Sequence, residues 1–153
     1  MARRWVVALM AGIFLIDRVI KDWIQSHMQI GQSIPVLPPV LWITYITNNG
    51  AAFSLFRHAV PMFIAIAVII LGAVGWYLAS RPRVPRIQGW GIGLLSGGTA
   101  GNLWDRVWHG RVIDYIHFRF WAIFNIADAA IVIGIGLLMW DYWRRDEEEH
   151  HGA

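Results

Sequence analysis

Hydrophobic residues gather in four long segments, at about residues 5–24, 60–80, 88–104 and 123–143, and polar residues collect between them. Each segment approaches the roughly 20 residues that an α-helix needs to cross the ~30 Å of hydrocarbon in a bilayer. The pattern therefore predicts an all-α membrane protein, in which four transmembrane helices form a single domain over residues 1–153.

The longest connection, residues 25–59, has a different pattern. Pro35, Pro38 and Pro39 exclude a long helix there. Residues 40–47 are rich in β-branched and aromatic side chains, and the turn-forming sequence Asn-Asn-Gly follows at 48–50. We predict a short strand and turn that lie at the membrane surface between the first two helices.

Composition supports a membrane protein. The chain is 57% hydrophobic and only 15% charged, whereas soluble domains carry about 25% charged residues. The net charge is only +3 and the basic residues are scattered, so nucleic-acid binding is not expected. There are no cysteines, which excludes disulfides, thiolate metal sites and cysteine nucleophiles.

Arginines near the segment ends suggest an orientation. Basic residues favour the cytoplasmic side of a membrane, and the short segment 81–86 contains three arginines and two prolines. We therefore predict that both termini are cytoplasmic and that the 25–59 loop is extracytoplasmic. The third apolar segment also has glycines at every fourth position, which predicts a seam for close helix packing; they are Gly89, Gly93, Gly97 and Gly101.

Charged residues interrupt the first apolar segment. Asp17 and Lys21 lie four residues apart and so share one helix face, where they attract each other. Ionisable groups inside a span usually face the protein interior and serve a site; an ion pair that only lets the helix end is the alternative. Arg18 and Asp22 are expected at the membrane interface.

Further acids collect around the third and fourth segments. Asp105 and Arg106 close the third segment, and Asp128 opens the fourth. Asp114 lies between them, so a chain that folds back brings it near Asp128. Two neighbouring carboxylates share a proton, and such a pair can activate water as in aspartic peptidases. Spacing alone leaves open that these acids are solvated loop residues or part of an ion path.

Four motifs in this order resemble the bacterial lipoprotein signal peptidase family, also called signal peptidase II. The first is Asp17-x-x-x-Lys21, and the second is Asn-Asn-Gly-Ala-Ala-Phe at 48–53. The third begins Gly-Asn-Leu-Trp-Asp-Arg at 101 and ends at Asp114, and the fourth is Phe-Asn-Ile-Ala-Asp at 124–128. The resemblance covers nearly the whole chain.

The resemblance implies an aspartic endopeptidase of the bacterial cytoplasmic (inner) membrane. It would remove the signal peptide of a prolipoprotein just before the diacylglyceryl-modified cysteine, with Asp114 and Asp128 as the catalytic pair. The positioning residues would be Asn48, Gly50, Asn102, Asp105, Arg106 and Asn125, with Asn102, Asp105 and Arg106 on the outer rim of the cleft. Asp17 and Lys21 would support the site or the fold, and the 25–59 loop would form a small β cradle and flap over the cleft, between the first two helices.

The resemblance also implies no metal or organic cofactor, inhibition by the cyclic peptide globomycin, and a monomer that meets only lipidated prolipoproteins and membrane lipid. Two alternatives remain at this stage. One is a small transporter or channel subunit with the acids as an ion path, and the other is a family member that binds substrate without cutting it.

Overall fold

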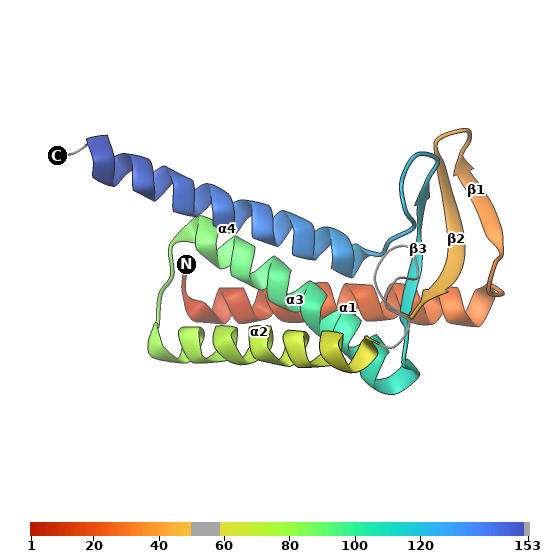
Figure 1. Ribbon diagram of the computed structural model, residues 1–153, viewed down its shortest axis with the longest axis horizontal. Coiled ribbons are helices and arrows are strands. Elements are labelled where there is room, and N and C mark those ends of the chain that lie inside the picture. The colour runs from red at the N-terminus through yellow and green to blue at the C-terminus, as the bar shows by residue number, and fades with distance from the viewer. Residues whose placement is uncertain (50–58, 152–153) are drawn as a thin grey trace.

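The computed structural model describes the backbone of residues 1–49 and 59–151, and the side chains of these residues as far as 147. Within these ranges the chain forms four helices and a small antiparallel sheet (Figure 1). The helices are α1 (Arg3–His27), α2 (Val60–Ser80), α3 (Arg86–His109) and α4 (Ile126–His151), and the strands are β1 (Ser33–Leu37), β2 (Leu41–Asn48) and β3 (Val112–Phe118).

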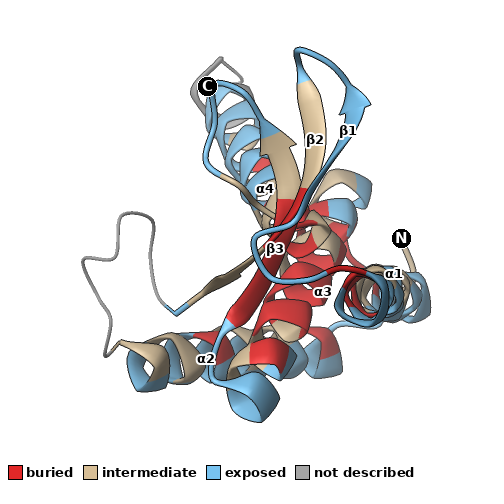
Figure 2. Ribbon diagram, turned by 90° about the vertical axis from the view of Figure 1, so that its right-hand side faces the viewer, coloured by how far each residue is buried: buried red, intermediate tan, exposed pale blue. Residues whose placement is uncertain are grey.

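The helix α3 is the centre of the bundle, since it packs against each of the other three helices. Buried residues concentrate on α3, on part of β3 and on the facing side of α1, whereas the outer helix faces are exposed (Figure 2). Many of those exposed side chains are large and apolar, such as Ile69, Trp76 and Val132. Apolar surface on the outside of a bundle is what contact with lipid requires.

Two of the helices in the described part of the chain are long and apolar enough to cross a membrane: α2, and α4 over Ile126–Glu147. The other two fall short for reasons visible in their sequences. Four charged residues follow one another closely in α1 at positions 17–22, and α3 is rich in glycine, which adds little hydrophobicity. The four predicted segments thus all form helices, and composition alone marks two of them as spans.

The predicted glycine seam is confirmed. A Cβ atom added to Gly93 would lie 2.6 Å from Leu9, and one on Gly97 would lie 2.7 Å from Ile13, both on α1. Gly89 and Gly101 face Met1 and Asp17 in the same way. The seam therefore lets α1 approach the backbone of α3 along its whole length.

Sheet strands come from two distant parts of the chain. The predicted strand at 40–47 is confirmed as β2, which pairs with β1 on one side and β3 on the other. The prediction that the sheet lies only between the first two helices was wrong, because β3 follows α3. Ile24 of α1 and Met28, the residue that follows this helix, pack with Tyr45 and Ile113 beneath the sheet. The sheet therefore lies on the end of α1.

Two helix ends also differ from the prediction. The third helix continues past the expected end at 104 to His109, where Gly110 stops it with a left-handed backbone (φ 67°). Glycine adopts this conformation without the steric cost that other residues meet. The fourth helix begins at Ile126 rather than 123, because Phe124 pairs with Ile116 of β3 through backbone hydrogen bonds.

Candidate active site

The pairing of Phe124 with β3 brings the two candidate catalytic acids into one site. The Phe124 amide donates to the carbonyl of Ile116 over 3.1 Å, and the amides of Tyr115 and Ile116 donate back to Phe124. The chain is thus folded back between Asp114, on β3, and Asp128, in the first turn of α4. The fold-back that the sequence analysis required is confirmed.

Asn125 links the two acids directly. Its Nδ2 donates to Oδ1 of Asp114 over 2.8 Å, while its Oδ1 accepts from the backbone amide of Asp128 over 2.8 Å. The backbone amide of Asn125 also donates to Oδ2 of Asp128 over 3.4 Å. These reciprocal contacts between a residue before a helix and one in its first turn form a capping box. One residue therefore caps α4 and orients both carboxylates.

Asn102 of α3 holds the second acid from the other side. Its Nδ2 donates to Oδ1 of Asp128 over 2.6 Å. Its Oδ1 accepts from Nζ of Lys21 over 3.1 Å and from Nδ2 of Asn125 over 3.2 Å. The side-chain amide of Asn102 has one oxygen, and both donors bind to it. Its NH₂ group therefore points toward Asp128.

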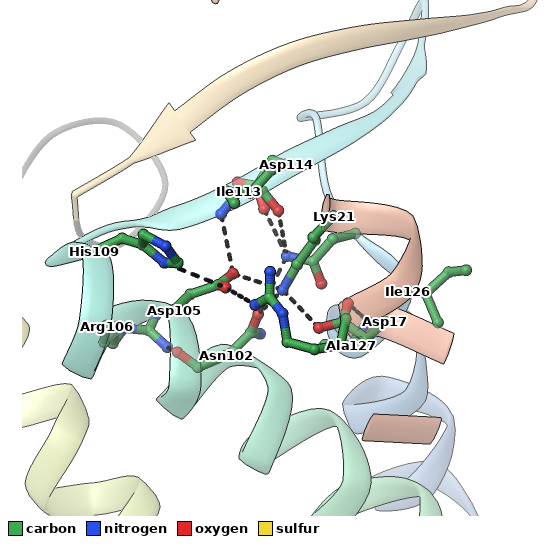
Figure 3. Close-up of polar contacts among 12 residues, drawn as sticks. Asp17, Lys21, Asn102, Asp105, Arg106, His109, Ile113, Asp114, Ile126 and Ala127 are labelled. Carbon is green, nitrogen blue, oxygen red and sulfur yellow. Dashed lines mark hydrogen bonds and ion pairs between the residues drawn. The ribbon is translucent and has the colours of Figure 1, made fainter. Parts of the chain in front are cut away.

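A buried ionic network lies beneath Asp114 (Figure 3). Lys21 is fully buried, and its Nζ lies 2.8 Å from Oδ2 of Asp17 and 2.8 Å from Oδ2 of Asp105. Arg18 pairs with Asp105 and, over 2.7 Å, with Asp22. Buried charges are retained only when they are paired, and here two cations of α1 meet acids of α1 and α3.

Two backbone contacts connect this network to the catalytic elements. Oδ2 of Asp105 accepts from the amide of Ile113 over 3.3 Å, next to Asp114 in the chain. Oδ1 of Asp17 accepts from the amide of Ala127 over 3.3 Å, next to Asp128. Asp105 and Asp17 thus each fix the backbone beside one candidate catalytic aspartate.

The environment of Asp114 changes its acidity. The carboxyl is 2% exposed, and burial together with the nearby charge of Asp128 raises its pKa to about 7. Hydrogen bonds from Asn48 and Asn125 and the charge of Lys21 oppose the rise. Below about pH 7 the Asp114 carboxyl is therefore mostly protonated beside the charge of Asp128, which is the arrangement that water activation by two carboxylates requires.

The remaining predicted residues occupy several positions. Nδ2 of Asn48 donates to Oδ2 of Asp114 over 3.3 Å. The Arg106 guanidinium lies over the ring of Phe63, 4.9 Å from its centre, and donates to the carbonyl of Asn102 over 3.4 Å. Gly50 and residues 51–58 of the predicted 25–59 loop lie outside the described residues.

Some expectations were wrong. Asp105 is fully buried and Asn102 is 4% exposed, so they lie beneath the site rather than on its outer rim. Arg18 was expected at the membrane interface, yet it is buried against Asp105. Its neighbour Asp22 is 65% exposed at the side chain and fits the expectation. Spacing along α1 gave no signal for Arg18, because its partner lies 87 positions away.

Comparisons with known proteins agree on one family. A family profile described as signal peptidase (SPase) II matches residues 9–144. The lipoprotein signal peptidase of Pelotomaculum thermopropionicum is 45% identical over 133 residues, which cover 86% of this chain and 87% of the relative. That of Streptococcus pyogenes serotype M6 is 34% identical over 149 residues, covering 96% and 98%.

Solved structures agree as well. One bacterial membrane enzyme superposes with a TM-score of 0.86 at 31% identity, covering 94% of this chain and 90% of the other. A second gives a TM-score of 0.81 at 33% identity, covering 90% and 91%. The helical bundle, the sheet at its end and the matched sequence together show that the chain belongs to the signal peptidase II family of aspartic peptidases.

Proposed function

We propose that this protein removes the signal peptide of prolipoproteins by cutting on the N-terminal side of the diacylglyceryl-modified cysteine, with Asp114 and Asp128 as the catalytic pair. The family and the names of its relatives support the substrate class. The observation that carries the mechanism is the placement of Asn125, whose side chain contacts Asp114 and caps the turn that bears Asp128.

In the proposed reaction Asp128 acts first as the base. It takes a proton from water while the oxygen attacks the scissile carbonyl carbon, and protonated Asp114 gives its proton to the carbonyl oxygen. The resulting gem-diol then collapses: Asp114 takes back a hydroxyl proton, the C–N bond breaks, and Asp128 delivers its proton to the departing nitrogen. Both carboxyls end in their starting states, as two-carboxylate catalysis requires.

The position of the pair suits a lipidated substrate. Asp114 and Asp128 lie at the end of the bundle where the helices meet the sheet (Figure 1). Each buried CH₂ of an acyl chain contributes about 0.8 kcal/mol to membrane binding, so a diacylglyceryl-cysteine stays at the membrane surface. An enzyme that cuts beside this residue needs its acids at that depth.

Supporting roles follow from the contacts. Asn102 and Asn125 orient the two carboxylates, and Asn48 contacts Asp114 from β2. In our proposal Arg106, with Asn48 and Gly50, also holds the extended substrate backbone. Asp17, Lys21 and Asp105 act beneath the site by fixing the backbone beside the acids.

The same proposal gives the setting of the enzyme. It acts as a monomer in the bacterial cytoplasmic membrane, with both termini cytoplasmic and the acids near the outer face, and needs no cofactor. An ion path would call for charged groups spread through the bundle. The buried charged side chains of the described residues instead collect near the sheet, except for Asp141 towards the other end.

Replacing either acid tests the proposal. We expect Asp114→Asn and Asp128→Asn to abolish cleavage of a purified, lipid-modified prolipoprotein, because an amide cannot exchange the proton that the reaction moves. The assay follows the mass of the product, which also reports the cleavage position. Native enzyme should be inhibited by globomycin, and full processing by either variant would contradict the assigned pair.

Two controls separate chemistry from folding. Asp22→Asn removes an exposed acid of the same region and should keep its activity, because such surface pairs contribute only about 0–1 kcal/mol. Asp114→Asn should not be less stable than the native chain at about pH 8. A raised folded-state pKa means that stability falls as pH rises from the ordinary value towards about 7, and the amide avoids this loss.

A further inference from the structure

A second site lies at the end of the bundle opposite the sheet, where α1 and α3 begin (Figure 1). A groove of about 750 Å³ opens there between the first turns of the two helices. This volume is within the range of small-molecule and cofactor sites. Its lining residues are Met1, Ala2, Trp5, Ala8, Leu9, Arg83, Arg86 and Trp90.

Backbone pairing builds the closed end of this groove. The N-terminal ammonium donates to the carbonyl of Val84 over 2.6 Å, and the Val84 amide donates back to Met1 over 2.9 Å. The Arg3 amide donates to the carbonyl of Pro82 over 3.1 Å. The N-terminus is thus held against residues 82–84, in a bridge that places Arg83 opposite Ala2.

The residues that line the groove are of two kinds: apolar side chains that can contact hydrocarbon, and arginines at its opening. Trp5 and Trp90 are 58% and 51% exposed, and Ala8 between them leaves space along α1. Arg83 and Arg86 are exposed at the mouth, and none of the residues that line the groove is acidic. The Arg4 guanidinium, 5.8 Å from the centre of the Trp5 ring, adds a further positive charge at the rim.

We propose that this groove binds an anionic phospholipid, with its phosphate between Arg83 and Arg86 and an acyl chain along Trp5, Ala8 and Leu9. Guanidinium groups form paired, charge-assisted hydrogen bonds with phosphate oxygens. The ligand must carry its negative charge at one end and hydrocarbon at the other, because the groove has the same division. Basic pockets beside membrane helices bind lipids of this kind.

The lipid would add to the contacts by which the glycine seam and the backbone pairing at residues 82–84 already join α1 and α3. It would contact the first turns of both α1 and α3 and the Arg83 bridge between them. It would not touch Asp114 or Asp128, which lie at the other end of the bundle (Figure 1). Binding there is therefore separable from cleavage chemistry, and the test below does not depend on the proposed function.

Native mass spectrometry of the full-length protein tests the proposal. The protein is purified in detergent, incubated with phosphatidylglycerol or phosphatidylcholine, and measured for retained lipid. We expect one strongly retained phosphatidylglycerol and little phosphatidylcholine. Arg83→Gln/Arg86→Gln should weaken retention about 30-fold, since each basic residue near an anionic headgroup contributes roughly 1 kcal/mol.

Two further variants make the test specific. Arg81→Gln removes an equal charge from the same segment, but Arg81 lies over Tyr77 at 4.9 Å and does not line the groove, so retention should be unchanged. Ala8→Trp fills the groove without changing its charge and should also prevent retention. The proposal would be overturned if all variants retained phosphatidylglycerol equally, or if the native protein retained phosphatidylcholine as well as phosphatidylglycerol. It would also be overturned if the protein bound no lipid and instead formed a dimer.

Discussion

At the scale of single residues, the raised pKa of Asp114 has a direct consequence for activity. Burial and the nearby Asp128 keep the proton on this carboxyl up to about pH 7. The proposed reaction uses that proton, so the cleavage rate should fall as pH rises through about 7. Initial rates measured from about pH 5 to about pH 9 would locate this falling limb.

Asn48 provides a test of whether Asp114 is the group that causes the fall in cleavage rate. Its hydrogen bond to Asp114 favours the charged form and lowers the pKa. Removing it in Asn48→Ala should therefore move the falling limb to higher pH, whatever happens to the maximal rate. A limb that stays in place, or moves to lower pH, would show that another group controls it.

Lys21 is the residue whose loss should be most damaging to the fold. Lys21→Met leaves the carboxylates of Asp17 and Asp105 buried without the cation that lies 2.8 Å from each. Removing one partner of a buried ionic pair costs about 3–5 kcal/mol, so the melting temperature in detergent should fall steeply.

The double variant Asp17→Asn/Lys21→Met removes one negative and one positive charge together. It should recover part of the lost stability, because fewer unpaired charges remain in the interior. A single variant as stable as the native chain would show that the network contributes little to folding. Comparing the double variant with Lys21→Met separates two effects on stability: the unbalanced buried charge and the change in side-chain volume.

At the scale of elements, glycines decide how closely α4 packs on α3. A Cβ on Gly134 would lie 2.6 Å from the amide nitrogen of Leu95 and 2.8 Å from the carbonyl oxygen of Gly91. These are backbone atoms that cannot move aside. Gly134→Ala should therefore destabilise the protein by about 1–3 kcal/mol, as overpacking does, and thermal unfolding in detergent measures the loss.

Gly136 is the control for this substitution, two residues along the same helix. A Cβ there has no heavy atom within 4 Å, and alanine favours a helix over glycine by about 1 kcal/mol. Gly136→Ala should be as stable as the native chain or more so. Equal loss in both variants would mean that helix flexibility, rather than close packing, explains the glycines of α4.

At the scale of the whole molecule, the positions of the two chain termini predict how the protein is oriented in the membrane. α1 begins and α4 ends on the side of the bundle away from the sheet (Figure 1). The chain has no cysteine, so single cysteines can be labelled in intact cells with a membrane-impermeant maleimide. Leu37→Cys in β1 should be labelled, whereas Arg81→Cys after α2 should be protected until the membrane is opened. The reverse pattern would invert the proposed orientation.

Local patterns were enough to predict much of this protein. Runs of apolar residues predict the four helices, because a helix that faces lipid needs them along its whole length. The four-residue spacing of glycines predicts the seam against α1, and β-branched residues predict β2. Asp114 and Asp128 could also be selected as a pair, since each closes one of the motifs that resemble the family. The Asn-Ile-Ala-Asp sequence at 125–128 and Gly110 signal the true helix ends, and both signals were missed.

The tertiary structure alone decided what surrounds those acids. Arg18 and Asp105, or Lys21 and Asn102, lie more than 80 positions apart, and no local pattern encodes such contacts. β3 joins a sheet begun before α2 for the same reason. The sequence by itself therefore determined the helices and the seam, because these depend on local periodicity, and its motifs selected the acid pair as a prediction. Burial of the ionic network and the raised pKa of Asp114 depend on distant segments packing together, so only the folded chain could decide them.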